Sequence, residues 1–370
     1  MDKSKWEYKK LGEVCDLYQP KTISSDMLVP DGKYLVYGAN GVIGKYNKYN
    51  HENSEVLMTC RGATCGTINV SAPYSWINGN AMVVHPRTID LNAQYLVYQL
   101  KAADKTSVIT GAAQPQITRQ MLQTLPFVVA PITDQQRIVA ELDCLNEMIA
   151  LKQEQLKEFD TLAQSIFYDM FGDKDFPMYQ LKDILSKIGS GATPSGGNQS
   201  YKTEGISLIR SLNVHNNLFV YKDLAFIDEQ QAKQLNNVTI EEGDVLLNIT
   251  GASVARCCVV PNDVIPARVN QHVSILRPRK ELLDSLYLCH FLISCDEQAK
   301  LLSLSKSKAA TREALPKNLL EKYMIKLPPL ALQQQFAEKI QAIEAQKELI
   351  KKSIAETQQL LDSRMDYYFD

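Results

Sequence analysis

A stretch in the middle of the chain returns at the C-terminus, and this repeat constrains the fold more than any other feature. Residues 131–171 and 329–369 align without a gap at an offset of 198. In each copy, apolar residues alternate four and three positions apart, which is the spacing of a helix that packs against another helix. The identical pairs are Pro131/Pro329, Gln135/Gln333, Gln136/Gln334, Leu151/Leu349, Glu158/Glu356, Leu162/Leu360, Ser165/Ser363 and Phe171/Phe369.

The apolar positions of the two copies predict one intramolecular helix seam. We expect the helices to run antiparallel as a rigid spacer, each roughly 50 Å long at about 1.5 Å per residue. Lys152 and Lys347 fall within this seam, where a charge sets the register of a helix pair. The residues expected to form the seam and to serve subunit docking are Ile138, Leu142, Leu145, Ile149, Leu156, Phe336, Ile340, Ile343, Ile350, Ile354 and Leu361.

The segments between the helices repeat as well. They are rich in short strand-like runs punctuated by glycine, which is typical of mixed α and β structure. Residues 55–63 match 244–252 at an offset of 189, and residues 77–83 match 269–275 at an offset of 192. We predict an α+β fold with a pseudo-twofold internal repeat. Two mixed α/β recognition domains, 1–132 and 175–329, are joined by spacer helices at 133–174 and 330–370, which form a long antiparallel coiled coil.

Charge is segregated along the chain. The net charge is −2, but the two predicted helices sum to −7, so the globular parts carry about +5. Mildly basic globules suit a polyanion ligand, although solvated surfaces alone often produce such an imbalance. No apolar run approaches the roughly 20 residues of a membrane span, and the N-terminus has no apolar signal core. We expect a cytoplasmic protein with no membrane partner.

No residue pattern in the chain predicts catalysis. Residues 38–45 superficially resemble a phosphate-binding loop, but the spacing is one residue too long and Tyr46 replaces the Ser or Thr that would meet magnesium. A hairpin turn is the better interpretation. The eight cysteines form no CxxC pair, and no histidine stands at zinc spacing, so we expect reduced, mostly buried thiols and no metal. The sequence predicts a non-enzyme.

The order globule, Pro-x-x-x-Gln-Gln helix, globule, Pro-x-x-x-Gln-Gln helix resembles the specificity (S, HsdS) subunit of type I restriction-modification enzymes. The resemblance covers essentially the whole chain, and no single piece of it is specific. The pieces that carry it are Ala130-Pro-Ile-Thr-Asp-Gln-Gln-Arg-Ile138, Pro328-Pro-Leu-Ala-Leu-Gln-Gln-Gln-Phe336, Gly191-Ala-Thr-Pro-Ser195, Gly243-Asp-Val-Leu-Leu247 and Gln164-Ser-Ile-Phe-Tyr-Asp-Met-Phe-Gly172.

This resemblance implies that each globule is a target recognition domain for one half of a split double-stranded DNA sequence. It also implies that the helices bind two methyltransferase (M) subunits, and that restriction (R) subunits join through this core of two M subunits and one S subunit. No cofactor is expected on this chain. S-adenosylmethionine, ATP and Mg belong, by the same implication, to the partner subunits, which carry out N6-adenine methylation and cleavage.

The residues expected to contact DNA lie in loops that combine basic side chains with amide or hydroxyl side chains. Basic and hydroxyl groups bind phosphates, whereas arginine and amide groups recognise base edges. In the first globule these candidates are Lys21, Thr22, Arg61, Thr64, Gln114 and Arg119. In the second they are Thr193, Ser195, Arg210, Asn213, Asn248, Arg256, Lys306, Lys308 and Arg312.

Two alternatives stay open. The same architecture serves the specificity subunit of a type II (IIB or IIG-like) system, in which the nuclease and methylase are fused. A different class is a coiled-coil scaffold whose two globules bind proteins or glycans rather than DNA. Binding that loses all sequence dependence at physiological salt would favour the scaffold.

Overall fold

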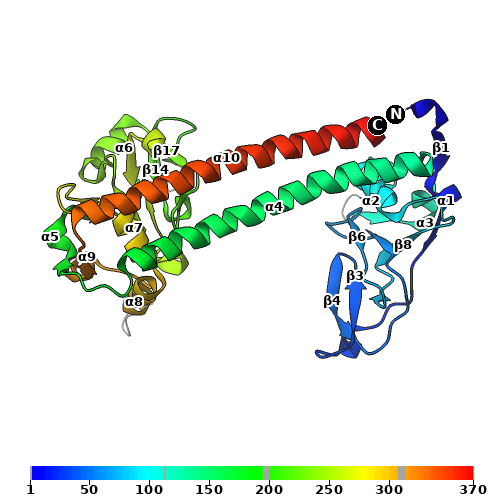
Figure 1. Cartoon of the computed structure of the whole chain (residues 1–370), viewed down its shortest axis with the longest axis horizontal. Helices are drawn as coiled ribbons and strands as arrows, with labels where there is room; N and C mark the ends of the chain where they lie inside the picture. Colours follow the sequence, from blue (N-terminus) through cyan, green and yellow to red (C-terminus); the bar gives the residue numbers. More distant parts are fainter. Residues whose placement is uncertain (1, 112–113, 195–199, 307–312, 370) are drawn as a thin grey trace. The chain divides into compact units, whose positions relative to one another are not determined.

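The computed structural model describes residues 2–111, 114–194, 200–306 and 313–369 (Figure 1). The chain forms two compact units, each of which takes one globule and half of both long helices. The first unit comprises residues 1–154 and 351–370, and the second comprises residues 155–350. The division into four segments at 132, 174 and 329 follows the secondary structure instead, and it stays a prediction.

The globule of the first unit is built on an antiparallel four-stranded sheet with strand order β2-β8-β5-β6. A smaller sheet, β4-β3-β7, joins an antiparallel hairpin to a parallel strand, and two-stranded sheets β1-β11 and β10-β9 complete the unit. The hairpin β3-β4 spans the stretch that superficially resembles a phosphate loop. The elements are β1 Glu7–Lys10, α1 Leu11–Val14, β2 Cys15–Tyr18, β3 Tyr34–Gly38, β4 Gly41–Tyr46, β5 Val56–Thr59, β6 Ile68–Val70, β7 Trp76–Ile77, β8 Ala81–Pro86, α2 Ala93–Ala102, β9 Ile109–Thr110, β10 Gln116–Ile117, α3 Arg119–Leu122 and β11 Pro126–Val129.

The globule of the second unit repeats this topology. Its four-stranded sheet has the order β13-β21-β18-β19, its three-stranded sheet the order β17-β14-β20, and β12 pairs with β22 as β1 pairs with β11. The elements are β12 Met178–Gln180, α5 Leu181–Ile184, β13 Leu185–Ser190, β14 Ile206–Ile209, β15 Val214–His215, β16 Leu218–Phe219, β17 Ala225–Ile227, α6 Glu229–Gln234, β18 Val245–Asn248, β19 Cys257–Val259, β20 Ala267–Val269, β21 Val273–Pro278, α7 Ser285–Ile293, α8 Cys295–Ser305, α9 Lys317–Lys322 and β22 Met324–Lys326. The predicted α+β class and internal repeat are confirmed.

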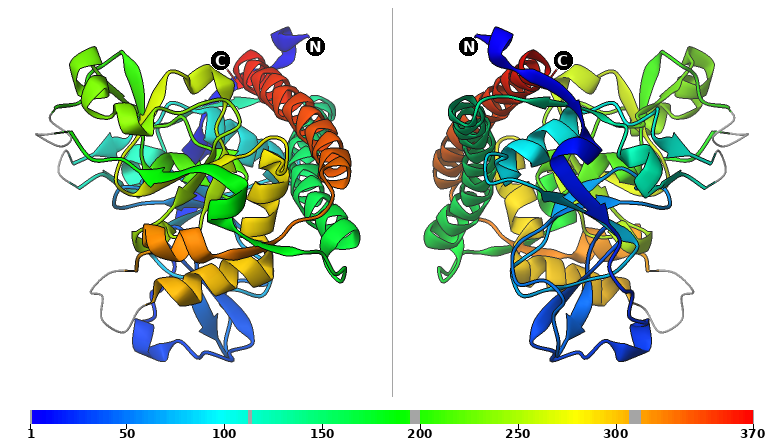
Figure 2. Two further views of the ribbon diagram at one scale, coloured as in Figure 1. Left: turned by 90° about the vertical axis from the view of Figure 1, so that its left-hand side faces the viewer. Right: turned by 90° about the vertical axis from the view of Figure 1, so that its right-hand side faces the viewer.

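The long helices α4 (Ile132–Phe171) and α10 (Leu330–Phe369) each have 40 residues (Figure 1). Within the first unit their segments are antiparallel: Glu141, early in α4, contacts Arg364 and Tyr368, late in α10. The chain ends belong to this unit and lie side by side, with the Lys3 ammonium bonded to the Tyr367 carbonyl (Figure 2). All predicted seam residues are buried or half-buried, as packing of one helix against another requires.

A buried glutamine joins the start of each long helix to its globule. In the first unit the Gln135 side chain is fully buried. Its amide nitrogen donates to the carbonyls of Ala130 (2.7 Å) and Asp90 (2.9 Å), and its oxygen accepts from the Asn92 backbone N–H (2.8 Å). Asn92 in turn caps α2. The glutamine therefore ties three parts of the unit together through one side chain.

The second unit contains the same arrangement. The buried Gln333 amide donates to the carbonyls of Pro328 (2.8 Å) and Leu282 (3.1 Å) and accepts from the backbone N–H of Asp284 (2.9 Å), which caps α7. The identical Pro-x-x-x-Gln-Gln sequences are thus explained by their first glutamine. The second glutamine of each pair, Gln136 and Gln334, is exposed.

We predict that Gln135→Ala destabilises the first unit by about 2 to 4 kcal/mol, because three buried polar groups lose their partner. Gln136→Ala is the matched control, since its side chain is exposed and its loss should change stability by less than about 0.5 kcal/mol. Hydrogen exchange should report faster opening of α2 in the first variant alone. Equal exchange rates in both variants would contradict the assigned role.

A buried histidine predicts a pH dependence for the second unit. Burial, and then the nearby Lys347 ammonium, lower the pKa of His290 from its ordinary 6.5 to about 4. The unfolded chain therefore takes up this proton first as the pH falls, and the neutral folded form loses stability between pH 6.5 and 4. We expect His290 to contribute about 3 kcal/mol to this loss. His290→Phe keeps a ring beside Phe167 and Phe336. It should reduce the pH dependence of the unfolding free energy, measured by urea denaturation, over that range. An unchanged pH dependence would contradict the role assigned to His290.

Candidate functional site

Four loops of the first unit meet at one end of its four-stranded sheet. The Cys60 N–H donates to the Asn80 carbonyl (3.2 Å), and the Gly62 N–H donates to the Pro115 carbonyl (3.0 Å). The Gly79 N–H donates to the side chain of Thr22 (3.1 Å). We call residues 19–22, 60–66, 78–80 and 114–119 the first loop face. Hydrogen bonds hold the backbone of this face, and the Thr22 hydroxyl takes part in one of them.

The second unit has a matching set of loops, which we call the second loop face: residues 191–194, 249–256, 270–272 and 313–317. The Ile249 N–H donates to the His272 carbonyl (2.9 Å), as Cys60 does to Asn80. The Gly251 N–H donates to the Glu313 carbonyl (3.0 Å), as Gly62 does to Pro115. The same frame is therefore built twice.

Glycine is required at the turn of each loop face and at one close contact. Gly62 and Gly251 have φ angles of +87° and +75°, a conformation that other residues adopt only with strain. A Cβ atom on Gly191 would lie 1.8 Å from the Val269 carbonyl oxygen, whereas one on Gly189 would meet nothing within 4 Å. The loop at 191–194 therefore lies directly on the neighbouring strand.

The predicted residues of the first unit come together on its loop face. All six are exposed, and Arg119 opens the short helix α3 at the edge of the face. The backbone of Arg61 bridges to Gln116, which orders the loop below its side chain. These six residues are Lys21, Thr22, Arg61, Thr64, Gln114 and Arg119.

The predicted residues of the second unit are only partly brought together. Thr193 and Arg256 belong to its loop face, and Lys306 is exposed just after α8. Arg210 is half-buried; its guanidinium bonds to the Asp223 carbonyl and lies 5.3 Å from the ring centre of Tyr201. Ser195, Lys308 and Arg312 lie outside the described residues.

Two asparagines proposed as DNA contacts are corrected by the structure. Asn213 and Asn248 are fully buried. The Asn213 amide donates to the Val220 carbonyl (2.8 Å), and the Asn248 amide donates to the carbonyls of Ser211 (2.9 Å) and Val214 (3.1 Å). Because these side chains satisfy loop backbone from within, they shape the second unit and do not face a ligand.

Two positions on the loop faces were missed. The His272 carbonyl accepts the Ile249 backbone bond, and its ring Nδ1 lies 2.5 Å from the Thr250 hydroxyl. Lys317 opens α9 as Arg119 opens α3, at an offset of 198. Extending the helix offset back through the preceding loop would have found Lys317. A single sequence gives no such signal for His272, which matches Asn80.

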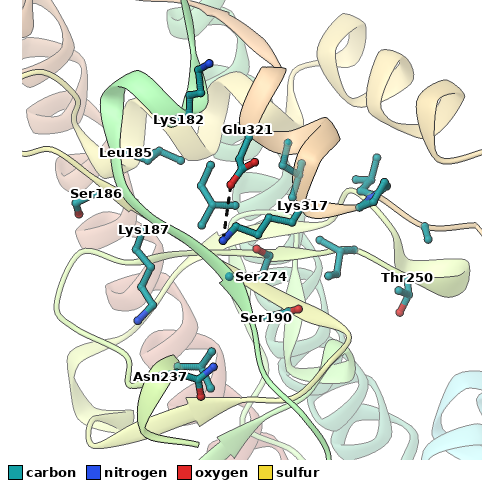
Figure 3. Close-up of a pocket in the computed structure, with 18 residues that line it drawn as sticks. Lys182, Leu185, Ser186, Lys187, Ser190, Asn237, Thr250, Ser274, Lys317 and Glu321 are labelled. Atoms are coloured by element: carbon teal, nitrogen blue, oxygen red, sulfur yellow. Dashed lines mark ion pairs between the residues drawn. The ribbon is translucent and has the colours of Figure 1, made fainter.

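A cleft of about 720 Å³ runs beside the second loop face (Figure 3). Lys317 extends from α9 toward β13, with its ammonium 3.7 Å from the Glu321 carboxylate. Lys182, Lys187, Asn237 and hydroxyl side chains from three strands or loops complete the polar lining. Thr250 is one of these hydroxyl residues and also belongs to the loop face. Ammonium and hydroxyl groups of this kind hold phosphate oxygens.

A second set of repeated residues lies on the outer side of the long helices. Leu151 and Leu349 are 58% and 61% exposed, and Leu162 and Leu360 are 45% and 48% exposed. Glu158, Glu356, Ser165 and Ser363 recur at the same offset on this side. These large apolar side chains therefore recur at nearly equal exposure outside the buried seam. We call the Glu, Leu and Ser positions 158, 162, 165 and 356, 360, 363 the exposed stripes.

Within the residues that the structure describes, no helix is long and apolar enough to cross a membrane. No group of three or more His, Cys, Asp or Glu side chains in this part of the chain could hold a metal ion.

Comparison with known proteins gives consistent matches. The family model for the type I restriction modification DNA specificity domain matches residues 3–159 and 173–359. A putative type I specificity subunit of Mycoplasma pneumoniae is 25% identical over 192 residues, and another of the same organism is 26% identical over 207. These alignments span 48% and 51% of the chain and about half the length, 52%, of each relative. A putative type I restriction enzyme specificity subunit of Haemophilus influenzae is 22% identical over 100% of this chain and 95% of its own length.

Solved structures agree in fold. The crystal structure of a type I restriction-modification S subunit from M. genitalium superposes with a TM-score of 0.59 at 14% identity, covering 97% of this chain and 95% of that one. A chain from a study of complex assembly and conformational transition in a type I system gives a TM-score of 0.60 at 18% identity, covering 98% and 97%.

Proposed function

The chain belongs to the type I restriction-modification DNA specificity family, and we propose that it is the non-catalytic subunit that selects the DNA target of such an enzyme. Each loop face reads one half of a bipartite sequence in double-stranded DNA. The observation that carries this proposal is the repeated loop face: the same backbone hydrogen bonds occur in both units, while the side chains that they present differ. Two similar frames with different side chains suit two different half-sites.

The side chains on the loop faces have the chemistry that DNA requires. Lys21, Arg119 and Lys317 supply positive charge for phosphate oxygens, and exposed amide and guanidinium groups supply hydrogen bonds for base edges. The cleft beside the second loop face extends this lining with further ammonium and hydroxyl groups. We propose that the sugar-phosphate backbone follows this cleft past Lys317.

The exposed stripes support two copies of one partner. Because the same Glu, Leu and Ser residues recur in both long helices, two identical subunits can dock in the same way. We propose methyltransferase subunits for this role, with restriction subunits joining through them. S-adenosylmethionine, ATP and Mg are then held by these partners, and no cofactor is required on this chain. The seam residues stay inside the helix pair and serve docking only by holding the outer surface in place.

The function is tested by sequencing modified bases in DNA of the source strain with and without this gene. We expect methyl-adenine to disappear from one split motif when the gene is removed and to return when it is restored. The motif directly gives both half-sites and the gap between them. A methylation pattern that stays unchanged, with the gene expressed beside its methyltransferase subunit, would contradict the proposal and favour the scaffold alternative.

Docking on the exposed stripes is tested by counting bound partners. We expect Leu162→Asp or Leu360→Asp to reduce the methyltransferase subunits bound to the full chain from two to one, and the double variant to bind none. A charge placed in an apolar contact is costly, whereas the exposed leucines contribute little to folding. Native mass spectrometry of the co-expressed complex gives the count.

Leu304→Asp is the matched control for this experiment, because Leu304 has the same 45% exposure but lies on α8. It should leave two partners bound. Full occupancy in the Leu162 and Leu360 variants would exclude the stripes as the docking surface without affecting the proposal that the chain selects DNA.

A further inference from the structure

We propose that Arg61 reads a guanine in the half-site of the first unit, and that the matching position in the second unit, Thr250, reads its half-site as part of a fixed side-chain network. This inference rests on the proposed function and assigns the specificity of the two loop faces to named, equivalent positions.

The equivalence of the two positions follows from the backbone around them. Arg61 forms a bridge with Gln116, and Thr250 forms the same bridge with Ala314. The residue before each position is also held alike. The Ile117 N–H donates to the Cys60 carbonyl at 2.9 Å. In the second unit the Leu315 N–H donates to the Ile249 carbonyl at 2.8 Å.

The residue after each position is a glycine in the left-handed conformation, held by the opposite loop at 3.0 Å in both units. The backbone of positions 61 and 250 is therefore fixed on both sides. Because the backbone has the same fixed conformation at both positions, the DNA groups that each residue can contact depend on its side chain alone. Positions 61 and 250 are thus where the two faces can diverge without a change in the fold.

Arg61 is free to act on a ligand. It is exposed, and none of the described residues accepts a hydrogen bond from its guanidinium or pairs with its charge. Asn80 and Gln116 are exposed beside the same backbone contacts. A guanidinium donates two parallel hydrogen bonds to the O6 and N7 atoms of guanine in the major groove, which distinguishes guanine from the other bases. Arg61 therefore suits base recognition through a G·C pair.

The second unit fills the same place with a network. The Gln271 amide nitrogen lies 3.2 Å from His272 Nε2, and the Gln271 oxygen accepts from the Thr193 hydroxyl. The other ring nitrogen, Nδ1, lies 2.5 Å from the Thr250 oxygen. A hydroxyl has one donor and two acceptor sites, so Thr250 keeps hydrogen-bonding capacity for a base edge whichever way its bond to His272 runs.

This network connects three loops of the second face through side chains. In the first unit the residue that matches Gln271 is Gly79, whose backbone bonds directly to Thr22 and Gln19. A Cβ atom on Gly79 would lie 2.5 Å from the Pro20 carbonyl oxygen. The first face joins these loops through the backbone of Gly79, whereas the second joins them through the side chain of Gln271. The two faces therefore present different side-chain groups to bases.

The test uses the full chain co-expressed with its methyltransferase subunits and a library of split DNA targets with randomised half-sites. We expect Arg61→Gln to lower binding of the wild-type target about 10- to 100-fold and to change the preferred base at one G·C pair of one half-site. The other half-site and the gap should keep their wild-type sequence. Thr250→Val should alter only the half-site that the Arg61 variant leaves unchanged.

Arg87→Gln is the matched control, since Arg87 belongs to the first unit but pairs with Asp16 away from the loop face; it should keep the wild-type target. If Arg61→Gln weakens all sequences equally and lowers the salt dependence by about one phosphate contact, Arg61 binds the backbone and the inference is overturned. An unchanged target overturns it as well. A wild-type complex that selects no split target contradicts the proposed function instead.

Discussion

A buried glutamine amide at the start of each long helix is the contact on which both units depend. Gln135 and Gln333 each satisfy two carbonyls and one N–H that would otherwise be buried without partners. A glutamine is suited to this place because its neutral side chain both donates and accepts, and no charge has to be buried. Since one partner belongs to the cap of α2 or α7, the helix cannot shift without disturbing the globule.

This anchor separates the parts of the chain that must stay constant from those that can vary. The long helices have the same length and a constant offset of 198, whereas the offsets within the globules are 189 and 192 around β5/β18 and β8/β21. Loops can therefore gain or lose residues between fixed points. The backbone hydrogen bonds of the two loop faces have donor–acceptor distances that agree within a few tenths of an ångström. They keep the loop backbone in the same conformation while the side chains differ.

The helices, their seam and the internal repeat of the globules could be predicted from periodicity and matching segments, because burial leaves a regular pattern in the sequence. The DNA-facing residues could be predicted only in part. Asn213 and Asn248 carry the right chemistry but satisfy backbone groups inside the second unit, and polarity alone does not distinguish these roles. Lys317 could have been found from its match to Arg119 at the helix offset of 198, whereas His272 has no such signal because it matches Asn80.

The two lysines of the seam explain why its repeated halves are not interchangeable. Lys152 donates to Ser353 and Thr357, and Lys347 pairs with Asp160 across the seam and with Glu344 on its own helix. At the offset of 198, two copies of the first half would replace the partners of Lys152 with Gln155 and Phe159, and two copies of the second half would replace Asp160 with Gln358. Losing these partners is costly for a half-buried ammonium, above all for Lys152, whereas Lys347 would keep only Glu344. Both lysines have their full set of partners when one copy of the helix pairs with the other, which favours pairing between the repeats of one chain.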